Sequence, residues 1–66
     1  MSVAKIIEIS SESPKSFEDA IGAGITRASK TLHGIKSAWV AEQHVVVENG
    51  KVVLYRVDLK ITFVMD

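Results

Sequence analysis

Three side chains in the second half of the chain could bind a small flat molecule. Trp39 is the only tryptophan, and an exposed indole can stack on a planar aromatic ring. Gln43 and Arg56 could supply hydrogen bonds or contact a phosphate beside such a ring. Tryptophan is also enriched at self-association surfaces, which gives Trp39 a second interpretation as the anchor of a protein interface. The sequence therefore indicates either an aromatic binding platform or a subunit contact around Trp39.

The other reactive side chains show no pattern of a catalytic or metal site. His33 and His44 are far apart, have no cysteine partner and match no zinc spacing, so we expect neither to bind metal or to catalyse. The carboxylates do not have the spacing of a calcium-binding loop. Calcium sites formed jointly by several subunits stay an open alternative. No nucleophile elbow, phosphate loop or Ser/His/Asp order is present. We therefore expect a binding protein and not an enzyme.

The first half of the chain predicts one strand and one helix. Val3–Ile9 is rich in β-branched residues and alternates as a strand does. We expect Ser13 to cap the helix, with the proline after it at the first helical position, and Gly34 to be the C-cap. We interpret Gly22 and Gly24 as places where a neighbouring backbone approaches the helix. The apolar stripe of the helix consists of Phe17, Ile21, Gly24, Ile25, Ala28 and Leu32.

The second half predicts a β-hairpin made of residues 36–48 and 51–65. Asn49 and Gly50 between them are the strongest short signal of a type I′ turn. Extending the ladder back from this turn pairs Glu48 with Lys51, Val46 with Val53, His44 with Tyr55, Gln43 with Arg56, and Trp39 with Lys60. This register turns Glu42 and His44 toward the apolar side. The segment therefore contains either a β-bulge, which we favour, or a polar subunit interface.

Together these elements predict an α+β fold of β-α-β-β order, with a three-stranded antiparallel sheet packed on one helix. We place the last strand in the centre because it is the longest and alternates most regularly. Its side facing the helix carries Val53, Tyr55, Val57, Leu59, Ile61 and Phe63. The other face stays open and carries an exposed patch that should associate with another surface, made of Trp39, Val45, Val47, Val52 and Leu54.

Length and composition predict one small domain that associates with copies of itself. The chain has 66 residues and no cysteine, and we expect a single domain over residues 1–66. Such a core rarely supplies more than about 3–5 kcal/mol, and no disulfide can add to it. Eight basic and eight acidic residues give a net charge of zero, which argues against a nucleic-acid partner. No apolar run suits a membrane helix or a secretion signal, so we expect a cytoplasmic protein without a membrane partner.

The whole chain resembles the dodecin family. The resemblance is carried by Val3–Ile9, the helix entry Ser11–Pro14, the segment Ala28–Leu32 and the ending Tyr55–Phe63. Dodecins are β-α-β-β chains that assemble into hollow dodecamers, bind flavins as stacked pairs and store or buffer them. The resemblance thus implies a homododecamer that holds FMN or riboflavin at sites between subunits.

The resemblance also implies which residues contact the flavin. In flavin-binding dodecins a tryptophan at the start of the second strand stacks on the ring, and a glutamine on the third strand bonds its polar edge. Alignment without gaps puts that tryptophan at Ser37 and that glutamine at Arg56. Trp39 lies two residues later, on the same sheet face and about 7 Å further along the strand. The implied flavin-binding residues are Trp39, Arg56, Gln43 and Ser37.

Some dodecin-like proteins lack this tryptophan and are described as calcium-binding, and the Glu42–Gln43 segment resembles that branch. The sequence is therefore compatible with three functions. We favour a flavin-storing dodecamer. The alternative is a dodecin-like assembly that binds calcium or another small ligand and not flavin. An enzyme is disfavoured because no acid, base and nucleophile converge.

Overall fold

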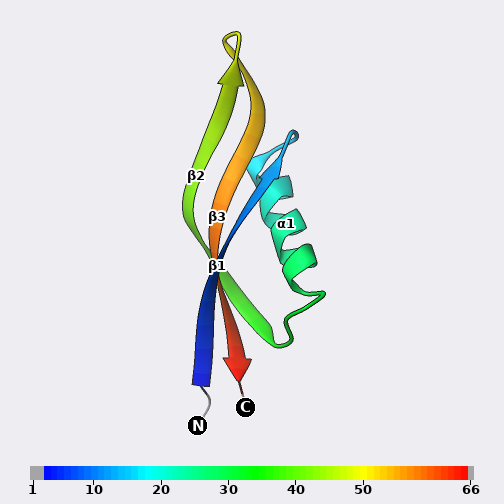
Figure 1. Ribbon diagram of the computed structural model, residues 1–66, viewed down its shortest axis with the longest axis vertical. Coiled ribbons are helices and arrows are strands. Elements are labelled where there is room, and N and C mark those ends of the chain that lie inside the picture. Colours follow the sequence, from blue (N-terminus) through cyan, green and yellow to red (C-terminus); the bar gives the residue numbers. More distant parts are fainter. Residues whose placement is uncertain (1–2, 66) are drawn as a thin grey trace.

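The chain folds into one three-stranded sheet and one helix (Figure 1). The computed structural model describes residues 3–65. In chain order these form strand β1 (Val3–Ser13), helix α1 (Phe17–Ala28), strand β2 (Ile35–Glu48) and strand β3 (Lys51–Met65). The strands are antiparallel in the order β1-β3-β2, and α1 packs on one face of the sheet. The predicted β-α-β-β fold, with the last strand in the centre, is confirmed.

The helix begins later than predicted. β1 continues to Ser13 because β3 offers it partners as far as Tyr55. The N-cap is Ser16, whose Oγ accepts the N–H of Asp19 at 2.9 Å. The buried Ser13 hydroxyl instead accepts the N–H of Lys15 at 2.9 Å and donates to Asp19 Oδ2 at 2.6 Å. The prediction of Ser13 as the cap was wrong because this serine closes the turn that precedes the helix.

The helix also ends earlier than predicted. Its last residue is Ala28, and Ser29 is the C-cap. The chain then makes a tight turn in which the N–H of Leu32 donates to the Ala28 carbonyl at 2.9 Å. Gly34 has the expected positive φ of 78°, but it lies at the entry to β2, where its carbonyl accepts the Val64 N–H at 3.1 Å. Gly34 therefore shapes a strand junction and is not the helix C-cap.

The core lies between α1 and the middle of β3. Buried apolar side chains from these two elements form its centre: Ala20, Ala28, Val57, Leu59 and Ile61. Half-buried apolar side chains surround them: Ile7, Ile9, Phe17, Ile21, Ile25, Leu32 and Ile35. The rings of Phe17 and Tyr55 meet edge to face, with their centroids 5.2 Å apart. The predicted packing of the helix stripe against one row of β3 is confirmed.

The two helical glycines meet different surroundings. A Cβ at Gly24 would lie 3.1 Å from Leu59 Cδ1 and 3.1 Å from Ser11 Cβ, so the sheet approaches the helix closely there. The approaching atoms belong to side chains, whereas the prediction named a backbone. A Cβ at Gly22 would meet nothing within 4 Å. Only Gly24 is therefore needed for packing inside this chain.

The hairpin turn has the predicted conformation. Asn49 and Gly50 have φ of 52° and 75°, and positive φ at both positions is what a type I′ turn requires. The predicted pairs at the two ends of the ladder, Glu48 with Lys51 and Trp39 with Lys60, are confirmed.

Between these ends the predicted register is wrong by one residue. The structure pairs Val46 with Leu54, Val45 with Tyr55, His44 with Arg56 and Gln43 with Val57. Near Val47 one residue of β3 is left without a partner, which shifts the pairing by one residue. Between Val40 and Glu42 one residue of β2 is left without a partner, which restores the original pairing. The second is the β-bulge that we favoured from the sequence.

The molecule is long and thin, and one end consists of two strands only. Its extents are 52 × 19 × 13 Å, and its radius of gyration is 13.6 Å, against about 11 Å for a compact chain of this length. Its accessible surface of 4878 Å² exceeds the roughly 4,100 Å² typical of a folded chain of 7.2 kDa. Beyond the pair of Ser13 with Tyr55, β2 and β3 continue without β1. We call this part, residues 45–54, the hairpin ribbon.

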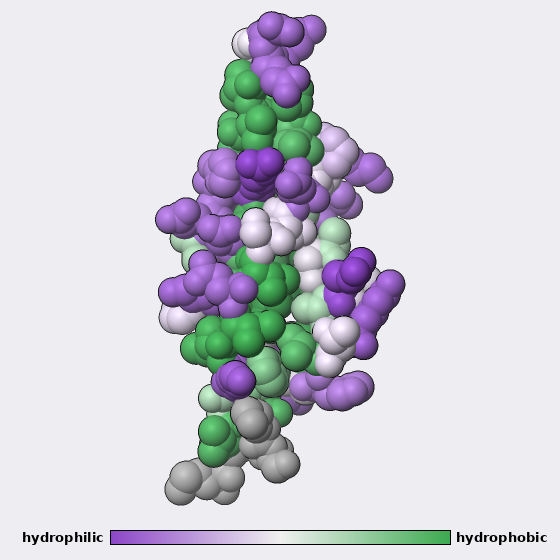
Figure 2. All heavy atoms as spheres, in the orientation of Figure 1, coloured by the Kyte–Doolittle hydropathy of each residue, from purple (hydrophilic) through white to green (hydrophobic). Residues whose placement is uncertain are grey.

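The hairpin ribbon exposes apolar side chains. Val45, Val47 and Val52 are 37%, 55% and 46% exposed. Figure 2 shows this apolar surface directly below the polar tip at the upper end of the view. The predicted exposure of these valines is confirmed, whereas Leu54 is half-buried. The predicted position of Val45 on the open face is wrong, because the shifted register pairs Val45 with Tyr55, whose ring packs on Phe17 of the helix. Two strands alone are marginally stable in water, so we expect another surface to cover the hairpin ribbon.

Candidate functional site around Trp39

Trp39 lies on the sheet face that the helix does not cover. Side chains of β3 alternate between two faces, and the buried row of Val57, Leu59 and Ile61 faces α1. Trp39 pairs with Lys60, which belongs to the other row. The indole is 68% exposed, an unusual state for a tryptophan side chain. We call this side of the sheet the uncovered face.

Two shallow hollows flank the Trp39 side chain. One, of about 310 Å³, is lined by Ser37, Ala38, Trp39 and Thr62. The other, also of about 310 Å³, is lined by Trp39, Val40, Ala41 and Lys60. Ser37 pairs with Thr62, so their two hydroxyls lie on the uncovered face beside the indole. The indole thus has room for a flat ring beside it, with hydrogen-bonding groups at one side.

The bulge between Val40 and Glu42 decides which side chains share this face. After it, Glu42 pairs with Asp58, and His44 pairs with Arg56, so both point to the uncovered face. Gln43 pairs with the buried Val57 and therefore points to the opposite side. The predicted pairing of Gln43 with Arg56 beside Trp39 is wrong, because the register had no bulge in it.

Three rows of side chains cross the uncovered face from β1 through β3 to β2. They are Glu8, Lys60 and Trp39; Ser10, Asp58 and Glu42; and Glu12, Arg56 and His44. Arg56 Nε lies 3.4 Å from Glu12 Oε1, with both side chains about half exposed. Asp58 next to Glu42 is a neighbour that the sequence reasoning missed, whereas Thr62 next to Ser37 follows from the predicted register, although the pair was not named. Correct placement of the bulge would have revealed the first pair.

Arg56 and Trp39 of one chain are too far apart to hold the same small ring. Arg56 lies four positions before Lys60, the partner of Trp39, which corresponds to about 13 Å along β3. Of the four predicted flavin-binding residues, the structure brings together Trp39 and Ser37. A ligand that contacts both Trp39 and Arg56 would need them from different copies of the chain.

Within residues 3–65 of one chain, no three His, Asp or Glu side chains are grouped so as to hold a metal ion. Over the same residues, no helix is long and apolar enough to cross a membrane.

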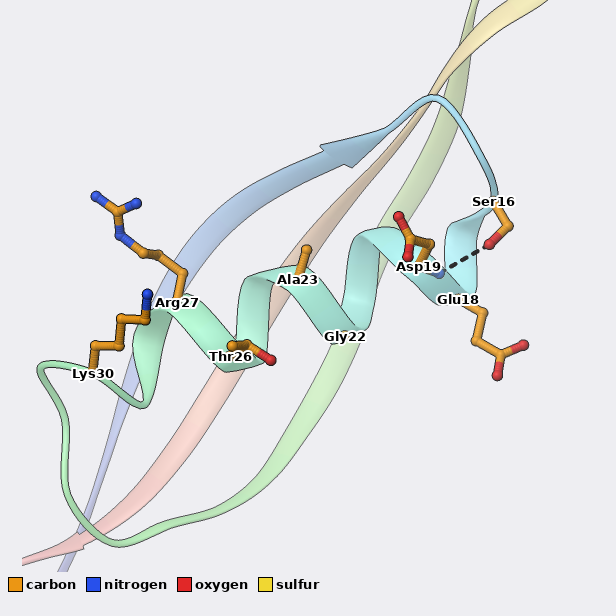
Figure 3. A pocket seen from close by; sticks show the side chains of 8 residues that line it. All are labelled: Ser16, Glu18, Asp19, Gly22, Ala23, Thr26, Arg27 and Lys30. Carbon is orange, nitrogen blue, oxygen red and sulfur yellow. Dashed lines mark hydrogen bonds between the residues drawn. The ribbon is translucent and has the colours of Figure 1, made fainter.

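A larger open hollow lies on the far side of the molecule, along the outer surface of α1 (Figure 3). It encloses about 740 Å³ and has small residues in its middle, namely Gly22, Ala23 and Thr26. Figure 3 shows acidic side chains at the N-terminal end of the helix and basic ones at the other end, the arrangement that the helix dipole favours. It offers no aromatic side chain to a flat ligand, so the Trp39 hollows are the better candidate site.

The comparisons with known proteins point to one family. A family model described as Dodecin matches residues 3–66. Calcium dodecin from Mycobacterium tuberculosis is 37% identical over 65 residues, which are 98% of this chain and 92% of that protein.

Solved structures agree with this match over the whole length. A dodecin from Streptomyces davaonensis has a TM-score of 0.92 at 31% identity, with 98% of this chain and 96% of the other covered. A variant of the Thermus thermophilus dodecin has a TM-score of 0.94 at 30% identity, with 100% and 98% covered. The M. tuberculosis calcium dodecin, described with a novel calcium-binding site, has a TM-score of 0.84 at 38% identity, with 98% and 93% covered.

Proposed function

We propose that this chain, which belongs to the dodecin family, stores flavin by holding it against Trp39 between the subunits of a homododecamer. The observation that carries the proposal is an indole that is 68% exposed on an uncovered sheet face. In this proposal residues 1–66 act as one dodecin-like domain that binds FMN or riboflavin and catalyses no reaction.

The shape of the protomer supports association with other copies. The surface is larger than a folded monomer of this mass needs, and the hairpin ribbon leaves Val45, Val47 and Val52 exposed. Exposed apolar surface and open strand edges favour pairing with another protein surface. A closed assembly of identical chains would cover the ribbon and complete the Trp39 site.

The residues around Trp39 suit an isoalloxazine ring. The indole would stack on one face of the ring, and the Ser37 and Thr62 hydroxyls could donate to or accept from its polar edge. Arg56 would reach the ring from a second copy, where the guanidinium can donate hydrogen bonds to ring oxygens. Gln43 does not belong to this group within one chain, because it points to the other side of the sheet.

Storage needs no reacting group, only sequestration. A flavin held between aromatic side chains is shielded from water and from other reactants. Trp39 supplies stacking area, and the neighbouring subunits supply walls. The hydroxyl and charged groups on the uncovered face supply polar contacts for such a ligand.

Titration of riboflavin or FMN with the purified protein tests the proposal. We expect flavin fluorescence to be quenched on binding, because stacking on the indole brings the two rings into contact. Replacement of Trp39 by phenylalanine should weaken binding, and replacement by leucine, which keeps apolar bulk without a ring, should abolish quenching. Light scattering on each variant checks that the assembly is intact. Unchanged emission with the wild type, or full quenching with Trp39→Leu, would contradict flavin storage on Trp39.

Calcium binding is a second candidate, favoured by one specific observation. Glu42 and Asp58 lie directly opposite each other on the uncovered face. Like charges at such positions destabilise a sheet, and a calcium ion accepts carboxylate oxygens readily. The described part of one chain groups no third His, Asp or Glu with this pair, so in this candidate function other oxygen atoms, from neighbouring copies or from water, would complete the coordination.

Thermal unfolding with and without calcium tests this candidate. Calcium should raise the melting temperature of the wild type, since a ligand that binds only the folded state stabilises it. The shift should disappear in Glu42→Gln and persist in Glu18→Gln, a matched change on the outer surface of α1. An equal shift in both variants would argue against a site at Glu42.

A further inference from the structure

Two basic side chains of β3 on the uncovered face, Lys60 and Arg56, lie in directly paired positions with acidic residues of β1. Lys60 lies opposite Glu8 of β1, and Arg56 lies opposite Glu12 of β1. The second pair is close, with Arg56 Nε 3.4 Å from Glu12 Oε1. Opposite charges in directly paired positions attract across the sheet. Within one chain, each of these two cations thus lies opposite a carboxylate of β1.

Asp58 has no such partner on either neighbouring strand. It lies between Ser10 of β1, which is uncharged, and Glu42 of β2, which carries the same charge. Side chains in paired positions have Cβ atoms about 4.5–5.5 Å apart, so the two carboxylates share one small region. Among the described residues, the uncompensated negative charge on this face is thus concentrated at Glu42 and Asp58.

This carboxylate pair lies next to the indole. Asp58 and Lys60 are neighbours on the same face of β3, which places the Glu42–Asp58 row about 7 Å from the row of Trp39. That spacing is within the Debye length of about 10 Å at 0.1 M salt. A charged group attached to a ring that stacks on Trp39 would therefore experience the field of both carboxylates.

We propose that Glu42 and Asp58 make the Trp39 site select a flavin without a phosphate over a phosphorylated one. The inference rests on the proposed flavin storage and names the class of flavin stored. Riboflavin and FMN share the ring that stacks on Trp39 and differ by a phosphate monoester, which carries about −1.5 to −2 charges near neutral pH. Repulsion between that phosphate and the two carboxylates lowers the affinity for FMN only.

The experiment compares the dissociation constants of riboflavin and FMN on the same assembled protein. EDTA is present so that no metal cation neutralises the pair, and the pH is the same for both flavins. At low salt we expect riboflavin to bind roughly five-fold tighter than FMN, a ratio that should approach one in high salt. Equal binding, or tighter binding of FMN, overturns the inference while leaving flavin storage intact.

Charge-neutral variants locate the effect. Glu42→Gln and Asp58→Asn keep the side-chain shape, and both should tighten FMN binding with riboflavin binding unchanged. Each variant removes a like-charge contact, so folding is not endangered. Glu18→Gln changes net charge equally on the outer surface of α1 and should leave the ratio unchanged. If the ratio of the FMN and riboflavin dissociation constants changes equally in all three variants, the inference is overturned. If neither flavin binds the wild type, flavin storage is refuted and the inference with it.

Discussion

Gly22 and Gly24 lie two residues apart in α1, yet the structure gives them opposite roles. Gly24 faces the sheet, where an added Cβ would lie 3.1 Å from atoms of Leu59 and Ser11. Gly22 faces away from the sheet, and an added Cβ would meet nothing within 4 Å. Alanine is favoured over glycine in a helix by roughly 0.5–1 kcal/mol when no contact intervenes.

Substitution of each glycine by alanine should therefore change stability in opposite directions. We expect Gly22→Ala to stabilise the protein by about 0.5–1 kcal/mol, and Gly24→Ala to destabilise it by about 1–2 kcal/mol through overpacking. Urea unfolding at one fixed protein concentration measures both, because assembly links stability to concentration. If Gly22→Ala proves as destabilising as Gly24→Ala, the outer surface of α1 is in close contact with another copy.

Residue-level predictions succeeded where a residue's chemistry acts locally. Asn49 and Gly50 tolerate positive φ, and the turn forms where they stand. Trp39 was expected on the open face and lies there with its expected partner Lys60. The side of the sheet taken by Gln43 was predicted wrongly, because it depends on a bulge whose position no single residue type reveals.

At the scale of elements, the hairpin ribbon is the feature that most needs explanation. It continues past the end of β1, and its valines have no covering layer in the protomer. We expect these valines to be buried against other copies, because exposed apolar strands otherwise aggregate.

A lysine in the ribbon should therefore disturb assembly. Val52→Lys places a charge on side-chain surface that is 46% exposed in the protomer, and we expect the particle mass to fall or the protein to aggregate. Thr26→Lys, on the outer surface of α1, serves as a control that should keep the particle mass. Sedimentation velocity compares the two, and an unchanged mass for Val52→Lys would show that the ribbon is not an interface.

Element types and order followed from sequence pattern, whereas element ends did not. The alternation in β3 and the apolar stripe of α1 were sufficient to place the core. Ser13 and Ser16 are both suitable caps, and tertiary hydrogen bonds decide between them: Ser13 is held by Asp19 and Lys15 in the turn. Gly34 is needed for its contact with β3, which no local pattern indicates.

At the scale of the whole molecule, the single chain is more extended than a compact chain of its length. Its radius of gyration and surface both exceed those of a compact chain of 66 residues. The family resemblance seen in the sequence is confirmed by the match to dodecins over nearly the whole chain. The ligand and the number of subunits stay predictions, because both depend on surfaces that lie between copies.

Size-exclusion chromatography with light scattering and visible absorbance, after incubation with riboflavin, tests the central claim most directly. We expect one peak with twelve times the 7.2 kDa mass of a single chain, and flavin absorbance that travels with it. A particle with the mass of one chain, or a twelve-chain particle from which all flavin separates, would contradict storage of flavin between subunits.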